Sequence, residues 1–304
     1  MRMACFGLLL CCLLAAPQIS VARDIYVNNE IGDDRNDGSL PSNESNGVGP
    51  CRTITRALKH ARKGDRIILA KTEKPYRESI TLQGGRHSGG EVQPFVIIGN
   101  GAVLDGSAPV KSDAWKHHAK DIFRFRPDYL TSQQLFHEGR PLQRVELEHA
   151  PTMDDLEPMQ WGLHGGYVYF RAEESRIPQE YELSHSKLPV GIALYCVRNV
   201  QIVDLTVQGF VLDGINAHDS VYETIVGGVI ARGNGRSGIS IGGASKVQLE
   251  ACLIGNNSDV QVRGEGVAQL EIKNCDIIAD DPIAPAFERE SKVRISIDGT
   301  VVAD

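Results

Sequence analysis

The sequence predicts an all-β protein built as a parallel β-solenoid, and three observations support this fold class. The C-terminal third of the 304-residue chain repeats every 23 to 24 residues. Each repeat carries short alternating apolar stretches broken by Gly and Asn, and it is too short for a strand–helix–strand crossover. The 31 Gly and only 2 Trp favour tight turns over a large helical core. A fixed period of this size indicates stacked units that bury their apolar sides against their neighbours.

Residues 1–22 are expected to be a signal peptide. Arg2 provides the charged start, residues 8–16 are apolar, and Ser20-Val21-Ala22 is a small-x-small cleavage site. The mature chain is therefore expected to begin near Arg23 and to be secreted, periplasmic or on the cell surface. The apolar run is too short to span a bilayer, and we find no other transmembrane candidate in the sequence.

Residues 23–107 are predicted to form an N-terminal cap and the first coils. Residues 52–62 have the pattern of a helix, with Ile54, Leu58 and Ala61 on one apolar face and Gly64 as a stop signal. The segments that read as strands are residues 24–29, 66–70, 78–82, 95–98 and 102–104.

The polar loop before the helix contains Gly32-Asp-Asp-Arg-Asn-Asp-Gly38, whose oxygen ligands suggest Ca²⁺. Arg35 occupies one ligand position of the usual calcium loop, so a loop rich in Asx turns is the preferred interpretation. We expect no metal site and no cofactor, with Ca²⁺ the one alternative left open.

The order of motifs in this region resembles the N-terminal segment of secreted right-handed parallel β-helix proteins of the pectin-lyase-like superfamily. The motifs are Ile25-Tyr-Val-Asn-Asn29, Gly32–Gly38, Pro50–Leu58, Gly64-Asp-Arg-Ile-Ile68 and Tyr76–Leu82. The resemblance covers about residues 25–107 and 190–300. It implies a right-handed β-helix whose short helix plugs the open N-terminal end, as an exposed sheet edge requires. The superfamily includes lyases, hydrolases, epimerases and proteins without activity, so the resemblance does not define the chemistry.

Residues 108–188 interrupt the repeat and are predicted to form an inserted antiparallel β-hairpin lobe. His137-Glu-Gly-Arg140 has the composition of a hairpin turn, with Gly supplying a positive φ. The lobe resembles the insertion of β-helix glycoside hydrolases and their relatives. A structural flap without a ligand is the alternative.

Residues 189–304 are predicted to form the main coils. Two apolar columns are Val200/Thr224/Val247/Leu270/Val293 and Ile202/Val226/Leu249/Ile272/Ile295. A third column places Cys252 above Cys275. We expect two packed thiols there, with a disulfide as the alternative in an oxidising compartment. No C-terminal cap is visible before Asp304, and an open last coil would imply a partner or an oligomer. The oligomeric state is not predicted.

The candidate site residues lie on one outward face. If Ile215 and Ala217 point inward, Asn216 and His218 point outward. The expected outward column is Tyr195, His218, Gly242 and Arg263, flanked by the columns Asp219/Gly243/Gly264 and Ser220/Ala244/Glu265. Gln261 is expected to be exposed next to Arg263.

This set of residues suits an acidic sugar. Arg263 is suited to bind a uronate carboxylate bidentately, and His218, Asp219 or Tyr195 to transfer the proton next to it. Asn216, Glu265 and Gln261 complete the predicted substrate-binding set. Asn216-Ala-His-Asp219 resembles the Asp-Pro-His-Asp motif of alginate epimerases, but Asn replaces the first Asp and Ala replaces Pro.

Three functions follow from these observations. The first is a lyase or epimerase that acts on an acidic polysaccharide. The second is a non-catalytic polysaccharide-binding or cell-surface structural protein, favoured by the short coil stack and by the missing Arg-x-Pro-x-x-Arg and Gly-His-Gly signatures of pectate lyases and polygalacturonases. The third is a glycoside hydrolase, for which Asp213, Asp219 and Glu265 form no clear carboxylate pair. The formal charge of −7 gives no reason to expect nucleic acid.

Overall fold

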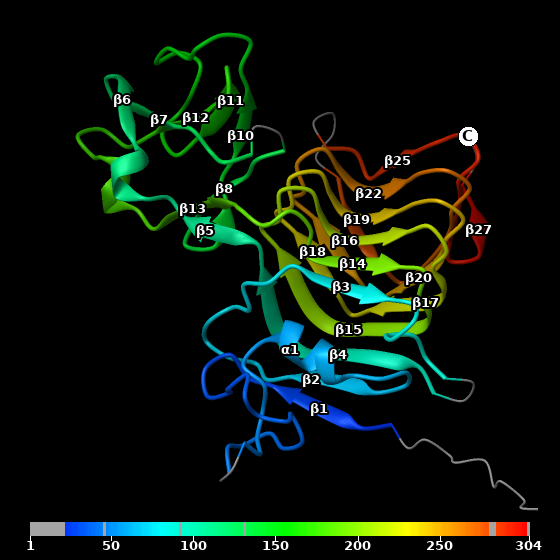
Figure 1. The fold of residues 1–304 in the computed structure, drawn as a ribbon. Coiled ribbons are helices and arrows are strands. Elements are labelled where there is room, and N and C mark those ends of the chain that lie inside the picture. The colour runs from blue at the N-terminus through cyan, green and yellow to red at the C-terminus, as the bar shows by residue number, and fades with distance from the viewer. Residues whose placement is uncertain (1–21, 45–46, 91–92, 130–131, 280–283, 303–304) are drawn as a thin grey trace, which may run out of the picture.

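The computed structural model describes residues 22–44, 47–90, 93–129, 132–279 and 284–302. The expected signal peptide lies outside the described residues, apart from Ala22. The described chain forms a stack of coils with a separate lobe on one side (Figure 1). No helix in the described ranges is long and apolar enough to cross a bilayer.

Two sheets of parallel strands form the coils. Sheet A contains β1 (Asp24–Val27), β2 (Arg66–Leu69), β4 (Phe95–Asp105), β15 (Arg198–Gln208), β17 (Tyr222–Gly227), β20 (Lys246–Glu250), β23 (Gln269–Lys273), β26 (Arg294–Ile297) and β27 (Thr300–Val301), with β18 (Ile230–Arg232), β21 (Leu253–Gly255) and β24 (Asp276–Ile278) on a side branch. Sheet B contains β3 (Ile80–Gln83), β14 (Ile192–Tyr195), β16 (Asp213–His218), β19 (Ser237–Ile241), β22 (Val260–Gly264) and β25 (Phe287–Arg289).

The apolar columns of the sequence are confirmed except at their last members. Leu270 pairs with Ile295, and Ile272 pairs with Ile297. The predicted pairs Leu270/Val293 and Ile272/Ile295 are therefore wrong by two residues. A shift of two residues leaves the inward and outward alternation unchanged, so the hydrophobic pattern alone does not detect it.

The bend in sheet A has the same backbone conformation in four successive coils. Asp204, Gly228, Ala251 and Asn274 have φ values of 54°, 59°, 50° and 50°. Gly228, Ala251 and Asn274 each separate a longer first strand from a short second strand, as between β20 and β21, whereas Asp204 lies at a register shift within the continuous strand β15. A residue with left-handed backbone conformation at the same position of each coil gives every coil the same turn. The number of residues per coil therefore stays nearly constant.

A buried polar ladder crosses the opposite corner. The Nδ2 of Asn257 donates to the carbonyl oxygen of Ala231 (3.1 Å) and to the Oε1 of Gln261 (2.9 Å), and its Oδ1 accepts from the backbone N–H of Asn234 (3.0 Å). The expectation that Gln261 is exposed is wrong, because this side chain is 0% exposed. Its amide satisfies backbone groups at the corner and belongs to the fold.

Helix α1 (Ile54–His60) covers the N-terminal end of the stack, as predicted, but ends four residues before Gly64. Ile54, Ala57 and Leu58 are buried in the solenoid core. Glu78 accepts hydrogen bonds from the N–H groups of Ile54 (2.7 Å) and Thr55 (2.8 Å) at the helix N-terminus. This capping role holds Glu78 outside β3, which therefore starts at Ile80.

The lobe contains two further sheets and two short 3₁₀ turns, Ser112–Ala114 and Pro178–Glu180. Sheet C is formed by β5 (Ser107–Pro109), β13 (Leu183–Ser186), β8 (Leu135–His137) and β9 (Arg140–Pro141), and sheet D by β10 (Arg144–Glu146), β11 (Trp161–His164), β12 (Tyr167–Arg171), β7 (Ile122–Phe125) and β6 (Lys116–Ala119). Nearly all of its pairings are antiparallel, and the exception is β10 with β11. Glu138 and Gly139 form the predicted hairpin turn, with φ values of 50° and 70°. The lobe has its own cores, one of them around the buried Trp161.

The last described strand partly covers the end of the stack. β27 pairs antiparallel with β26 after a turn at Asp298–Gly299. The expected open end is therefore corrected for sheet A. Within the main coils, Cys252 and Cys275 lie at equivalent positions of neighbouring coils, and both are free thiols. This arrangement agrees with the packed-thiol interpretation.

The polar ladder yields a prediction for stability. Replacing Asn257 with Ala leaves the amide partners of Asn257 unsatisfied in the core. We expect the free energy of unfolding to fall by about 2–4 kcal/mol. The midpoint of urea unfolding measures this change. Gln201→Ala, on the outward side of β15, is the matched control, and equal midpoints for the two variants would contradict a structural role for the ladder.

Candidate active site

The candidate site is a notch at the end of sheet B, formed by Tyr195, His218, Gly242 and Glu265 on consecutive strands. Tyr195 pairs with His218, and the register of the next strands places Gly242 and then Glu265 in the same column. A Cβ atom added to Gly242 would lie 3.1 Å from Nδ1 of His218 and 3.7 Å from Oε2 of Glu265. Gly242 is buried, and its missing side chain leaves room for the imidazole of His218 and the carboxylate of Glu265 to lie over it.

The register corrects the predicted column. Arg263 pairs with Ser240 and not with Gly242, and Glu265 takes the position expected for Arg263. The sequence pattern misled the alignment because Val260 and Val262 both fit an inward position opposite Ile239. The length of the coil decides between them, and it places Val262 opposite Ile239.

Arg263 lies next to the notch and is paired with two carboxylates. Its Nε lies 3.1 Å from Oε1 of Glu265, and its Nη2 lies 2.6 Å from Oε1 of Glu288. The first contact fixes the Glu265 carboxylate beside the notch. The second involves a half-exposed glutamate, and such surface pairs contribute only about 0–1 kcal/mol. Arg263 therefore exchanges Glu288 for another carboxylate at little cost.

Asp219 acts on Tyr195 at the open side of the notch. The negative charge of Asp219, together with a hydrogen bond, raises the pKa of the Tyr195 phenol above its ordinary value. The Tyr195 side chain is 54% exposed. Asp219 has a φ of 65°, a conformation that Asp tolerates better than most residues. The phenol of Tyr195 is therefore a weaker acid than an ordinary tyrosine.

A second cluster of polar side chains, around Asp213, is buried at the other end of the same strands. Asp213 is 0% exposed and accepts from Nε (2.9 Å) and Nη2 (2.5 Å) of Arg236 and from Oγ of Ser237 (2.7 Å). Asn216 donates to Asp213 (2.6 Å) and is 4% exposed, so the expected exposure of Asn216 is wrong. The Oδ1 of Asn216 and the Oγ of Ser240 are buried and have no hydrogen-bond partner among the described residues. This group fixes the sheet and holds Asp213 away from solvent.

Among the described residues, the polar contacts of the lobe with sheet B lie at that buried end. Arg144 donates to Ser258 (3.0 Å) and lies 4.0 Å from Asp259, whose pKa is raised by burial. Ser132 also contacts Asp259 (3.5 Å). These contacts lie at the start of the β22 strand, whereas Glu265 follows its end. Sequence analysis missed Arg144 and Arg236, because neither belongs to a motif and both act through contacts distant in the chain.

The carboxylates of the candidate calcium loop bind groups of the protein itself. Asp34 accepts from the backbone N–H groups of Arg52 (3.0 Å) and Thr53 (2.9 Å), and Asp33 pairs with Arg35 (2.6 Å). Among the described residues, no group of three His, Cys, Asp or Glu side chains is arranged to hold a metal ion.

Comparison with known proteins supports the fold. Residues 190–295 match the family model described as right handed beta helix region. With the parallel pairing of sheets A and B, this match confirms the predicted right-handed parallel β-helix. No curated protein sequence matches the chain.

Three solved structures are similar at low identity. They are XylC in complex with xylose (10% identity, TM-score 0.44, covering 90% of this chain and 69% of that chain), the pectate lyase Pel9A (13%, 0.46, 92% and 62%) and a GH136 lacto-N-biosidase from Eubacterium ramulus (10%, 0.27, 91% and 66%). This chain thus spans about two thirds of the length of those proteins. Similarity at this level carries no argument about activity.

The contact between Asp219 and Tyr195 yields a prediction. Asp219→Asn removes the negative charge and is expected to lower the pKa of Tyr195 toward its ordinary value. The phenolate absorbance during a pH titration measures the shift, after subtraction of the Tyr195→Phe variant. Asp121→Asn in the lobe is the control. A pKa equal to that of the unmodified protein would show that Asp219 does not act on the phenol.

Proposed function

We propose that this right-handed parallel β-helix protein is exported and acts on an acidic polysaccharide as a lyase or epimerase. The observation that carries the proposal is the convergence of His218 and Glu265 on the space above Gly242, with Tyr195 on the next strand. The residues of the N-terminal signal motif support export. The resemblance to the pectin-lyase-like superfamily supports a carbohydrate substrate.

The notch residues fit an acid–base reaction. His218 accepts the proton from the carbon next to the uronate carboxylate, and Glu265 stabilises the imidazolium that forms. In β-elimination the electron pair forms a C=C bond, the C–O bond to the next sugar breaks, and the leaving oxygen takes a proton from Tyr195. In epimerisation, the same carbon receives a proton on its opposite face. Tyr195 and His218 lie on adjacent strands, about 5 Å apart at their Cα atoms, which suits two groups that act on one sugar ring.

Arg263 is proposed to bind the uronate carboxylate. Charge neutralisation of this carboxylate makes the neighbouring C–H bond more acidic. The exposed Glu288 occupies Arg263 in the structure and would leave when substrate enters. Glu288 is thus proposed to act as a stand-in for the substrate carboxylate.

A non-catalytic binding function is the second candidate, and one observation favours it. The lobe contacts the chain near Ser258 and Asp259, at the opposite end of the strands from the notch. Among the described residues of the lobe, none of these contacts covers the notch, and cover of this kind excludes water in many active sites. A glycoside hydrolase is less well supported, because Asp213 is enclosed by Arg236, Ser237 and Asn216.

The central experiment compares the unmodified full chain with His218→Ala on a panel of acidic and neutral polysaccharides. Absorbance of unsaturated products, reducing ends and direct binding are measured together. We expect unsaturated or epimerised product from an acidic polymer, with a loss of about 100-fold or more in His218→Ala. His117→Ala in the lobe is the control and is expected to retain full activity. Binding without turnover in the unmodified protein would establish the non-catalytic function instead.

The role of Glu288 gives a separate prediction. Glu288→Gln removes the carboxylate that competes for Arg263, so KM for the acidic substrate is expected to fall by roughly threefold, within the range of one exposed ion pair. Arg263→Gln is expected to raise KM and to lower kcat. An unchanged or higher KM in Glu288→Gln would contradict the exchange of carboxylates at Arg263.

A further inference from the structure

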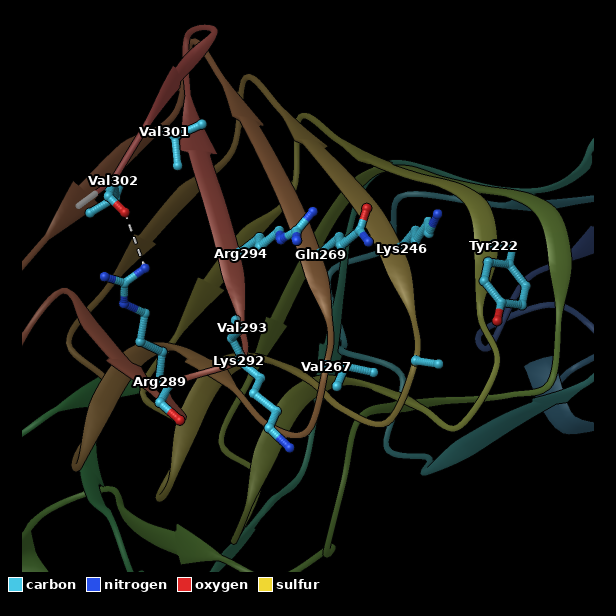
Figure 2. Close-up of a pocket in the computed structure, with 12 residues that line it drawn as sticks. Tyr222, Lys246, Val267, Gln269, Arg289, Lys292, Val293, Arg294, Val301 and Val302 are labelled. Carbon is cyan, nitrogen blue, oxygen red and sulfur yellow. Dashed lines mark hydrogen bonds between the residues drawn. The ribbon is translucent and has the colours of Figure 1, made fainter. Parts of the chain in front are cut away.

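A groove lies around the corner from the notch, on the outward face of sheet A. Two adjoining cavities of about 760 and 790 Å³ share Lys246, Gln269, Arg294 and Val301 in their walls. Figure 2 shows Arg294, Gln269, Lys246 and Tyr222 in a row across successive strands. Gly242 and Glu265 of the notch precede Lys246 and Gln269 by four residues each, so every coil contributes to both places.

Along the axis of the stack, the row alternates cationic and uncharged side chains. Lys246 pairs with Gln269, and Gln269 pairs with Arg294. Neighbouring strands are about 4.8 Å apart, so the two cationic side chains start about 10 Å apart with an amide between them. A linear ligand parallel to the axis meets a cation, a neutral hydrogen-bonding group and a second cation in turn.

Three cations of the groove, Lys246, Lys292 and Arg294, have no ion pair to any described residue. Two carboxylates, Glu223 and Glu271, also line the second cavity. Glu223 pairs with Arg198 (2.6 Å) and Glu271 pairs with Lys273 (2.9 Å), so both are already partnered by other cations. A concentration of positive charge thus stands in a chain with a net charge of −7.

Apolar side chains border the same groove. Val301 is 71% exposed and Val267 is 50% exposed, and both line the cavity near the C-terminal hairpin. Tyr222 lies at the other end of the row (Figure 2). Sugar rings combine apolar faces with hydroxyl and carboxylate edges, so a groove with apolar borders and a polar floor is complementary to a glycan.

We propose that this groove is a second binding site, which takes a carboxylated glycan chain lying along the solenoid axis. Arg294 binds one carboxylate with its two-pronged guanidinium group, Lys246 binds another, and Gln269 contacts the hydroxyl groups of the ring between them. The separation of the cations matches a chain with charge on alternate rings. This proposal extends the proposed function, because it assigns the polymer's binding site outside the notch, but the groove itself does not depend on catalysis.

Other polyanions fit the groove less well. Nucleic-acid sites of low specificity stack bases on several aromatic side chains, and Tyr222 is the one aromatic residue among those that line the two cavities. A densely sulfated glycan carries more charge than the two spaced cations of the row, Lys246 and Arg294, can match. Charge complementarity therefore favours one carboxylate for every second ring.

The test measures binding of a hyaluronan hexasaccharide, which carries a carboxylate on every second ring, to the full chain by calorimetry at low and moderate salt. The same oligomer with methyl-esterified carboxylates is the matched neutral probe. In Lys246→Gln/Arg294→Gln we expect the Kd for the acidic oligomer to rise roughly tenfold or more, with weaker salt dependence, because two charge-assisted contacts are lost. Lys111→Gln/Lys116→Gln, two exposed lysines of the lobe, is the control and is expected to bind as the unmodified chain does.

Further variants separate this proposal from the proposed function. His218→Ala is expected to lose turnover and to keep the Kd of the groove. Val301→Glu places a negative charge beside the cations without removing any side chain contact of the core, and it is expected to weaken binding of the acidic oligomer. Unchanged affinity in the groove double variant, equal binding of the esterified oligomer, or tighter binding of heparin or single-stranded DNA would each overturn the assignment of a carboxylated glycan.

Discussion

The structure depends on the requirement that successive coils close with nearly the same number of residues. Only then do parallel strands keep their register and apolar columns stay inside. Two devices impose this closure: the left-handed corner residues of sheet A, such as Asp204 and Asn274, and the buried amides of Asn234 and Asn257. The second device satisfies backbone groups that a tight corner would leave without partners. Outward side chains then fall into columns, so residues 23 apart in sequence become neighbours.

Sequence periodicity predicted the solenoid, the capping helix and the 137–140 hairpin, because each depends on local pattern. It failed where a register shift of two residues preserves that pattern. Arg263 was therefore placed above Gly242, where the structure has Glu265, and Ile295 was aligned with Ile272 instead of Leu270. Burial of Asn216 and Gln261 was also missed, since polar side chains that satisfy an interior corner look like surface residues in the sequence. The register and burial of these residues depend on how the coil closes and not on residue type.

The same closure separates opposite charges across one corner. On sheet B, the notch and its surroundings carry Glu265, Glu288 and Asp219 around the paired Arg263. On sheet A, the groove carries Lys246 and Arg294, while its two glutamates, Glu223 and Glu271, are paired with Arg198 and Lys273. Under both proposals, an acidic polymer would be attracted to the groove and repelled from the notch unless a carboxylate displaces Glu288. Binding energy from the groove can offset that repulsion, because contacts remote from the reaction can compensate for the cost of placing the reacting sugar ring in the notch.

The corner between notch and groove is also tightly constrained. Cys196, Asp219, Gly243 and Gly266 occupy it in successive coils, with φ values of 52°, 65°, 64° and 69°. A Cβ atom added to Gly243 would lie 2.7 Å from the carbonyl oxygen of Asp219, so the coils approach too closely there for a larger residue. This corner admits little change in length or direction. Its rigidity holds the acid–base residues and the cationic row at a constant offset, as two sites on one polymer would require.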